Sequence, residues 1–373
     1  MKAFSIPPKI HEAETFAEFA QQFALCETDL LFTHEFLYDD YMKGAAGGCQ
    51  TLFCERYGTG EPNDAMVSAI MKDLRGMRIN RVIGVGGGTV LDIAKLLCIK
   101  DAECFEDIFE DRIPLVREKG LILVPTTCGT GCEMTCVSVI DIPKRAAKIG
   151  KRIEANFADH AVLIPELLLK LPHAPFAYSA IDALVHAMEI YVAPTVSGYS
   201  QLFCREAILL LIRSFRYLSQ NGLEKRDVCI ADFLRASNYA GIALSNTVCG
   251  AVHASAMQFG GRHHVAHGES NYNFLVAVFR KYAEMAPDGI IRDIGAMINE
   301  AMGIQEDLPG SFRALGELLN SVIPRKGLRE YGAERKDLPA YVDTVFETQQ
   351  RLLVCNYVPM TKEDLLEVYE SAY

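Results

Sequence analysis

Four residues of the chain, Asp182, His186, His253 and His267, have side chains and spacings that suit a divalent metal ion. Asp182 and His186 are four residues apart in IDALVHAMEIYV, whose apolar periodicity predicts a helix. Both side chains should therefore leave one helical face, one turn apart. One carboxylate and three imidazoles without a thiolate suit iron(II), zinc, cobalt or manganese, and disfavour copper(I) and iron–sulfur clusters.

The second half of this ligand set lies in GAVHASAMQFGGRHHVAHGESN. There Gly260 and Gly261 are expected to end a helix and let the chain turn back, so that His267 reaches the same ion as His253. A helical Asp-x3-His pair alone is as readily a local hydrogen bond as a metal site. The chain has only 9 histidines in 373 residues, however, and four of them fall in this segment. We therefore interpret the segment as metal binding.

A separate cysteine series, Cys128, Cys132 and Cys136, lies in PTTCGTGCEMTCVSV. Its spacing matches neither zinc ribbons nor ferredoxins, and no fourth thiol is near in sequence. The other cysteines are scattered, and a chain of this length does not need cross-links, so we expect reduced thiols. This cysteine series leaves one alternative function for the protein: a redox or metal sensor that is not an enzyme.

The elements that must position these residues are of two kinds. In the first half, short apolar runs alternate with amphipathic stretches, which predicts a parallel sheet flanked by helices. The runs are DLLFT, RVIGV, LILVP, CVSVI and HAVLIP. After Pro172, long helical patterns such as AYSAIDALVHAMEIYV and SGYSQLFCREAILLLIRSFRYL replace them. The second half is therefore predicted to be all-helical.

A glycine turn, Gly86, Gly87, Gly88 and Thr89, follows the strand RVIGV and opens a helix. Its backbone N–H groups should lie at the positive end of that helix, where a phosphate binds well. Thr89 and Asp92 also form a capping-box-like pair, so a helix cap is the alternative to a cofactor contact for Asp92. The turn is neither a full G-x-G-x-x-G sequence nor a Walker loop, which disfavours ATP.

A second polar loop contains Thr126, Thr127 and Thr130 and follows the strand LILV. It should lie at the same carboxyl edge of the sheet, where ligands bind in such folds. Its hydroxyls suit a pyrophosphate or a ribose, and the alternative is a connection that satisfies its own backbone. We predict an α/β, Rossmann-like dinucleotide-binding domain over residues 1–176 and an all-helical metal and substrate domain over residues 177–373. The active site should lie in the cleft between them.

The charge of the chain narrows its partners. A formal charge of -11 and a pI near 5.4 argue against nucleic acid and anionic membranes, and favour a small-molecule substrate. The N-terminus lacks a signal-peptide-like apolar segment, and no run approaches the roughly twenty apolar residues of a membrane span. We expect a cytoplasmic protein.

Four segments carry a family resemblance: GVGGGTVLDIAK, PTTCGTGCE, IDALVHAMEIYV and VHASAMQFGGRHHVAHGESN. In order and separation they resemble the iron-dependent alcohol dehydrogenase family, over essentially the whole chain. The resemblance implies a homodimer and one iron(II) or zinc ion on the four ligands above. It assigns the glycine turn, Thr89 and Asp92 to NAD(H). The further cofactor residues that it implies are Thr126, Thr127, Thr130 and Lys148, the last reaching the cofactor ribose.

Further segments, among them EFLYDDY, GEPNDAM and LREYGAERKDLPAYVDTV, are similar to a clostridial branch that acts on 4-hydroxybutyrate. This similarity implies reversible hydride transfer between 4-hydroxybutyrate and succinate semialdehyde, with NAD as the hydride carrier and the metal as a Lewis acid. Another iron-type alcohol, 1,3-propanediol or glycerol dehydrogenase of the same fold is an alternative. A dehydroquinate-synthase-like enzyme is a further one, although it would need a more basic pocket.

Two departures from the family affect its chemistry. Met257 stands where many members have a histidine that relays a proton, so water, His263 or His264 is expected to carry the alcohol proton. His34, followed by Glu35, stands where many NAD-preferring members have an aspartate. A histidine there would not repel the 2′-phosphate of NADP as an aspartate does. We nevertheless expect NAD in preference to NADP.

The distal carboxylate of a four-carbon acid substrate needs a cation or hydrogen-bond donors. Arg262 and Arg351 are the candidates. For each of them, a solvated surface position or a structural ion pair is the alternative.

Overall fold

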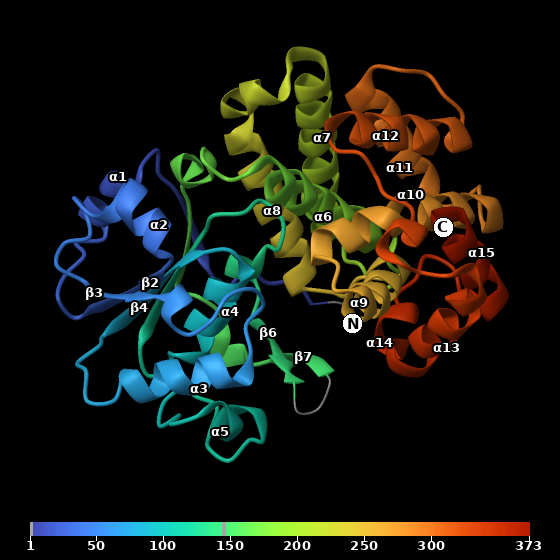
Figure 1. The fold of residues 1–373 in the computed structure, drawn as a ribbon. Helices are drawn as coiled ribbons and strands as arrows, with labels where there is room; N and C mark the ends of the chain where they lie inside the picture. Colours follow the sequence, from blue (N-terminus) through green and yellow to red (C-terminus); the bar gives the residue numbers. More distant parts are fainter. Residues whose placement is uncertain (1–2, 144–146) are drawn as a thin grey trace. The chain divides into compact units, whose positions relative to one another are not determined.

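The computed structural model describes residues 3–143 and 147–373, without the side chains of Ala147 and Lys148. The predicted cofactor contact of Lys148 therefore lies outside the described residues. The chain divides into two compact units, Ile6–Leu171 and Pro172–Tyr373, and residues 3–5 belong to the second (Figure 1). The sequence placed the boundary after residue 176. The second unit begins earlier because its first helix starts at His173, directly after Pro172.

The first unit contains a six-stranded sheet in the order β1-β8-β5-β4-β2-β3, and every pair in it is parallel. Its central strands are buried along almost their whole length, as expected for a parallel sheet covered on both faces. The strands are β1 (Lys9–Glu12), β2 (Asp29–Thr33), β3 (Gln50–Phe53), β4 (Arg81–Gly86), β5 (Gly120–Pro125) and β8 (His160–Leu163).

The run CVSVI does not join this sheet, contrary to the sequence interpretation. Its residues from Val137 onward form β6 (Val137–Ile142), which pairs antiparallel with β7 (Ala147–Arg152) in a separate sheet. Burial alternates residue by residue along β6, whereas the parallel strands are buried continuously. The alternation is typical of a strand with one covered face.

The helices of the first unit are short. α4 (Gly88–Leu96) is buried from Val90 to its end, and its neighbours include the strands β4 and β5. α3 (Asp64–Asp73) begins after Asn63, whose side chain accepts a hydrogen bond from the Met66 N–H, as a helix cap should. The remaining helices are α1 (Phe16–Gln22), α2 (Glu35–Leu37) and α5 (Phe105–Phe109).

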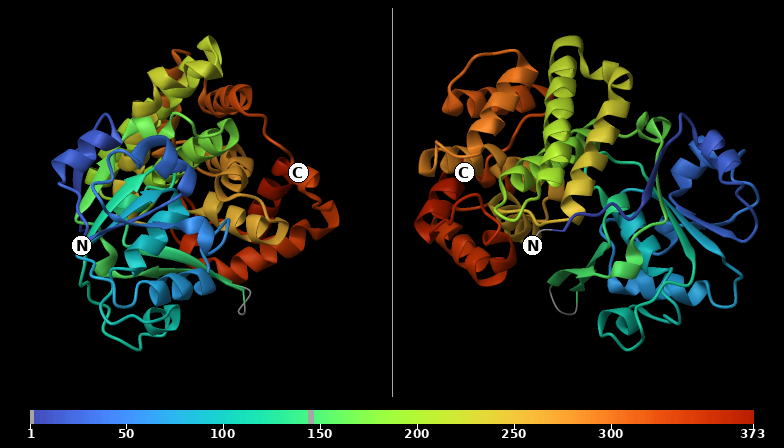
Figure 2. Two further views of the ribbon diagram at one scale, coloured as in Figure 1. Left: turned by 60° about the vertical axis from the view of Figure 1, so that its left-hand side comes forward. Right: turned by 180° about the vertical axis from the view of Figure 1, so that it is seen from behind.

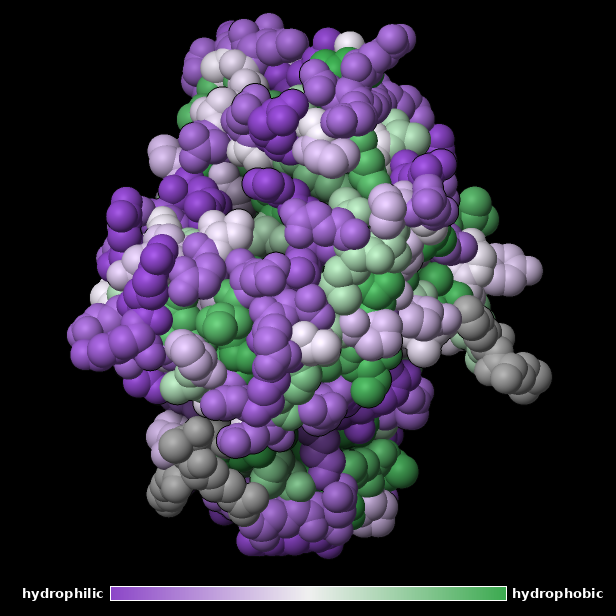
Figure 3. All heavy atoms as spheres, turned by 90° about the vertical axis from the view of Figure 1, so that its right-hand side faces the viewer, coloured by the Kyte–Doolittle hydropathy of each residue, from purple (hydrophilic) through white to green (hydrophobic). Residues whose placement is uncertain are grey.

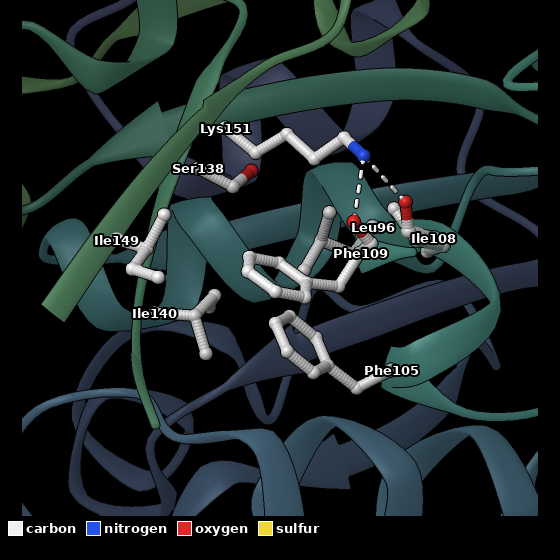
Figure 4. A pocket seen from close by; sticks show the side chains of 8 residues that line it. All are labelled: Leu96, Phe105, Ile108, Phe109, Ser138, Ile140, Ile149 and Lys151. Atoms are coloured by element: carbon white, nitrogen blue, oxygen red, sulfur yellow. Dashed lines mark hydrogen bonds between the residues drawn. The ribbon is translucent and has the colours of Figure 1, made fainter. Parts of the chain in front are cut away.

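Lys151 of β7 holds the end of α5. Its Nζ donates to the carbonyl oxygens of Ile108 and Phe109 at 2.8 and 2.9 Å and pairs with Asp111 at 2.7 Å. A mainly apolar pocket lies beside this lysine (Figure 4). Its lining includes no residue of the glycine turn or of the threonine loop, so we assign it to packing.

Residues 172–373 of the second unit form helices joined by loops and contain no strand, which confirms the predicted fold class (Figure 2). α6 (His173–Val192) packs against α7 (Gly198–Asn221), α8 (Ile230–Ser245) and α10 (His267–Met285), and α9 (Ala251–His263) packs on α10. The outer helices are α11 (Ile291–Met302), α12 (Leu308–Val322), α13 (Leu338–Thr348), α14 (Gln350–Leu353) and α15 (Lys362–Ala372).

The described helices include none that combines the length and the hydropathy needed to cross a membrane. On the face drawn in Figure 3, hydrophilic residues are widespread and hydrophobic residues form small groups between them.

Candidate metal centre and dinucleotide-binding turns

The four predicted metal ligands come together inside the helical unit. Asp182 and His186 lie on α6, His253 lies on α9, and His267 is the first residue of α10. One donor atom from each lies within 4.8 Å of the others. Nε2 of His186 and Nε2 of His253 are 3.0 Å apart, and Nε2 of His253 and of His267 lie 3.8 and 3.7 Å from Asp182 Oδ1. The structure thus places one carboxylate and three imidazoles around a common point.

The turn between α9 and α10 differs from the one expected. α9 continues through Gly260 and Gly261, and the left-handed residue that ends it is His264, with φ of 54°. A glycine is required instead at Gly268, where a Cβ atom would lie 2.4 Å from the carbonyl oxygen of Tyr178 on α6. This close approach lets the first turn of α10 bring His267 to the ligands on α6.

Glu189, which the sequence interpretation did not name, contacts one of the predicted metal ligands. Its Oε2 lies 2.7 Å from Nδ1 of His253, and its Oε1 accepts a hydrogen bond from the Val252 N–H at 2.6 Å. When the Nδ1–H of a neutral His253 donates to Glu189, the Nε2 atom keeps its lone pair toward His186 and Asp182. The signal was present in the sequence, because Glu189 follows Asp182 by seven residues and lies on the same face of α6.

Burial dominates the electrostatics of this pair. Burial, with the neighbouring His186 and His267, lowers the pKa of His253 well below its usual value, which keeps the ring neutral. Burial also raises the pKa of Glu189 to about 7, although backbone N–H groups oppose that shift. A neutral imidazole that carries its proton on Nδ1 has a free lone pair on Nε2, and this is the form that binds a metal.

Asn271 is a second residue that the sequence interpretation did not name and that contacts a predicted metal ligand. It follows His267 by one turn of α10 and is fully buried. Its Nδ2 donates to Asp182 Oδ1 at 2.6 Å and lies 3.2 Å from Nε2 of both His253 and His267. The electropositive amide group of Asn271 thus lies where the donor atoms of the predicted ligands converge. A cation would be favoured at the same position.

The donor set fits a small divalent ion by its chemistry. Burial opposes the charge of Asp182, but the three histidines and the Asn271 hydrogen bond outweigh it and lower the pKa of its carboxyl. Three of the four ligands are buried, whereas the side chain of His267 is 36% exposed. Exposure on one side is what a catalytic metal site needs, because substrate must reach it.

Two of the residues predicted to carry the proton or bind substrate, His263 and Arg262, contact other side chains of the second unit. His263 is held at both ring nitrogens, because Nδ1 donates to the Tyr331 carbonyl oxygen at 3.0 Å and Nε2 accepts from the Tyr341 hydroxyl at 2.8 Å. The guanidinium of Arg262 lies over the Tyr341 ring, 5.0 Å from its centroid. Of the other three, His264 and Arg351 are exposed and Met257 is half-buried.

The glycine turn and the threonine loop adjoin each other in the first unit. Gly86 ends β4, Gly87 is the N-cap of α4, and the Thr126 N–H donates to the Gly86 carbonyl oxygen at 3.0 Å. A Cβ atom on Gly87 would lie 3.4 Å from Thr127, and one on Gly88 would lie 3.4 Å from Thr130. The two loops therefore form one edge beside the N-terminus of α4, as a phosphate site requires.

The capping alternative for Asp92 is wrong. Thr89 Oγ1 donates to the Gly60 carbonyl oxygen at 3.0 Å, and the N-cap Gly87 has no side chain to offer. Asp92 is buried, and it accepts from Lys95 Nζ and from the Val139 N–H, each at 3.0 Å. Asp92 thus joins α4 to β6. Burial disfavours the charge of Lys95, but the Asp92 carboxylate raises the pKa of Lys95 above its usual value.

The cysteine series forms no ligand group among the described residues, because the clusters of potential ligands there do not include Cys128, Cys132 and Cys136 together. Cys128 and Cys136 are buried, and burial raises the pKa of Cys132 to about 12. These thiols suit packing, not reactivity.

Known proteins resemble the chain along its whole length. The family model for iron-containing alcohol dehydrogenase matches residues 8–165, and that for the C-terminal part of the Fe-containing alcohol dehydrogenase family matches residues 176–373. The chain is 40% identical over 373 residues to a 4-hydroxybutyrate dehydrogenase of Clostridium kluyveri, covering 100% of both chains. It is 33% identical over 305 residues to long-chain-alcohol dehydrogenase 1 of Geobacillus thermodenitrificans, covering 79% of this chain and 75% of that one.

Solved structures have the same fold. A sulfoacetaldehyde reductase from Bifidobacterium kashiwanohense in complex with NAD+ matches with a TM-score of 0.86 at 21% identity, covering 100% of this chain and 98% of that one. A 1,3-propanediol oxidoreductase matches with a TM-score of 0.86 at 22% identity and covers 100% of both chains. The sequence matches confirm the family resemblance of the sequence segments. The chain belongs to the iron-containing alcohol dehydrogenase family.

Proposed function

We propose that the protein is a metal-dependent, NAD-linked dehydrogenase that interconverts 4-hydroxybutyrate and succinate semialdehyde. The observation that carries the proposal is the convergence of Asp182, His186, His253 and His267, with one donor atom from each within 4.8 Å of the others. The identity of 40% over the whole length of a 4-hydroxybutyrate dehydrogenase supports the substrate.

The roles of the residues follow from their contacts. The four ligands would hold one divalent ion, iron(II) or zinc, which when bound supplies Lewis acidity to a carbonyl or an alcohol. Glu189 accepts the hydrogen bond from Nδ1 of His253 and thereby orients the His253 ring. Asn271 donates a hydrogen bond to the carboxylate of Asp182 and fixes its position. The backbone N–H groups at the start of α4 would bind the cofactor pyrophosphate.

The reaction transfers a hydride from NADH to the aldehyde carbon of succinate semialdehyde, and a proton to its oxygen. His263 is a poor proton carrier, because both of its ring nitrogens are engaged by Tyr331 and Tyr341. We therefore favour water as the proton carrier, with the exposed His264 as the remaining candidate.

A substrate panel tests the proposal. Protein loaded anaerobically with iron(II) or zinc is assayed for NADH oxidation with succinate semialdehyde, butanal, propanal and dihydroxyacetone. The proposal is supported if succinate semialdehyde is reduced faster than the other three substrates and if a chelator abolishes that reduction. Equal use of the uncharged aldehydes would instead favour another iron-type alcohol, 1,3-propanediol or glycerol dehydrogenase. The cytoplasmic location, the homodimer and the native metal stay predictions.

A further inference from the structure

The ends of three neighbouring strands meet beside the glycine turn. β2 lies between β4, which ends in the turn, and β3. The Thr33 hydroxyl at the end of β2 donates to the Val85 carbonyl oxygen on β4 at 2.8 Å. Thr33 is also in register with Phe53, the last residue of β3. His34 and Glu55, which follow these two strands, therefore lie at the same carboxyl edge.

In a dinucleotide site the pyrophosphate binds at the glycine turn, and an acidic side chain nearby accepts a hydrogen bond from the ribose 2′-hydroxyl. Here the residue directly after β2 is His34, which has no negative charge. The acidic side chain comes from the 3-10 turn that follows the neighbouring strand β3, because Oε1 of Glu55 lies 2.7 Å from Nδ1 of His34.

Both oxygens of Glu55 are held in place. Since an ionised carboxylate only accepts, Nδ1 of His34 donates to Oε1, and the Glu35 N–H donates to Oε2 at 3.3 Å. With its Nδ1 proton committed to Glu55, a neutral His34 ring presents an acceptor at Nε2. The side chains of His34 and Glu55 are 26% and 35% exposed, so a ligand can reach both.

We infer that Glu55, held by His34, is the residue that makes this enzyme select NAD over NADP. A ribose 2′-hydroxyl can donate to the Glu55 carboxylate or to Nε2 of His34. A 2′-phosphate has no comparable proton to give and brings about 1.5 to 2 negative charges against the carboxylate. Like charges in such proximity disfavour binding of the phosphorylated cofactor.

Arg56 is the local competitor, because a guanidinium binds phosphate well. Its guanidinium carbon lies over the Phe53 ring, 5.3 Å from the centroid. Arg56 is next to Glu55 in the sequence, but among the described ion pairs it has none with the Glu55 carboxylate. Selection by Glu55 and selection by Arg56 predict opposite cofactor preferences.

The inference rests on the proposed function only for the identity of the cofactor site, so its test uses binding. The dissociation constants of NADH and NADPH are measured by fluorescence titration of the full chain. Wild-type protein should bind NADH more tightly than NADPH. Glu55→Gln keeps an acceptor for His34 and removes the charge, and it should raise the affinity for NADPH relative to NADH by about tenfold or more.

Two matched variants serve as controls. Glu35→Gln removes a neighbouring charge whose side chain makes none of these contacts, and Arg56→Gln removes the competing cation. Both should leave the ratio of the two dissociation constants within about twofold of wild type. An unchanged ratio in Glu55→Gln, or a wild-type preference for NADPH, would overturn the inference.

A comparison on wild-type protein guards against misfolded variants: 5′-AMP should displace NADH more effectively than 2′,5′-ADP does, and the reverse order also overturns the inference. Failure of the proposed function has a different signature. NADH would then bind with the predicted preference while succinate semialdehyde was not reduced.

Discussion

Glu189 and His253, on different helices of the second unit, are joined by a hydrogen bond of 2.7 Å between Oε2 and Nδ1. The other oxygen of Glu189 accepts from the Val252 N–H at 2.6 Å, so the carboxylate binds both the backbone and the side chain at the start of α9. This arrangement sets the direction of the His253 ring, because Nε2 then points to His186 at 3.0 Å.

Glu189→Gln should weaken metal binding by about 10- to 100-fold, because the outer partner of a ligating histidine fixes its tautomer and orientation. Zinc affinity is measured by competition with a chromogenic chelator. Glu206→Gln, on the exposed surface of α7, is the matched control and should bind zinc like wild type. Equal affinities in the two variants would contradict the positioning role of Glu189.

Removal of metal should lower the melting temperature of the protein. An ion that binds only the folded state stabilises it by about 2.7 kcal/mol at a free concentration one hundred times its dissociation constant. Calorimetry with and without added zinc measures this difference in wild type. Asp182→Asn loses the charged ligand, and its melting temperature should respond little to zinc. A zinc response equal to that of wild type would exclude Asp182 as a ligand.

His263→Ala should destabilise the fold by about 1–3 kcal/mol, since it leaves partners of two hydrogen bonds unsatisfied. His264→Ala, at the exposed neighbouring position, should change stability by less than about 0.5 kcal/mol. Urea denaturation measures both variants. If His263 acts only structurally, the pH profile of turnover in His263→Ala should match wild type, and a shifted profile would restore it as a proton carrier.

Lys95→Met should cost about 3–5 kcal/mol, because it leaves the carboxylate of Asp92 buried without its cation. The double variant Lys95→Met with Asp92→Asn should be more stable than Lys95→Met alone, since an asparagine oxygen still accepts from the Val139 N–H. Guanidinium denaturation of the three proteins measures the coupling. A double variant no more stable than Lys95→Met would refute this account of the pair.

Local patterns in the sequence were enough to predict much of the fold. The continuous apolar runs predicted buried parallel strands, and the helical periodicity around Asp182 and His186 put both on one face of α6. These features depend on neighbours within one or two turns of the chain, so they can be interpreted without the tertiary structure. The run CVSVI was misassigned because a short apolar run does not reveal which strand it will pair with.

The sequence by itself determined which side chains are present for metal and cofactor chemistry, and their order along the chain. Only the tertiary structure decided that Glu189 meets His253, that Asn271 meets Asp182, and that Glu55 meets His34. The last of these pairs joins residues that are 21 positions apart and follow different strands, and the first two join residues 64 and 89 positions apart. Such contacts arise from the packing of helices and the pairing of strands, which no local periodicity specifies.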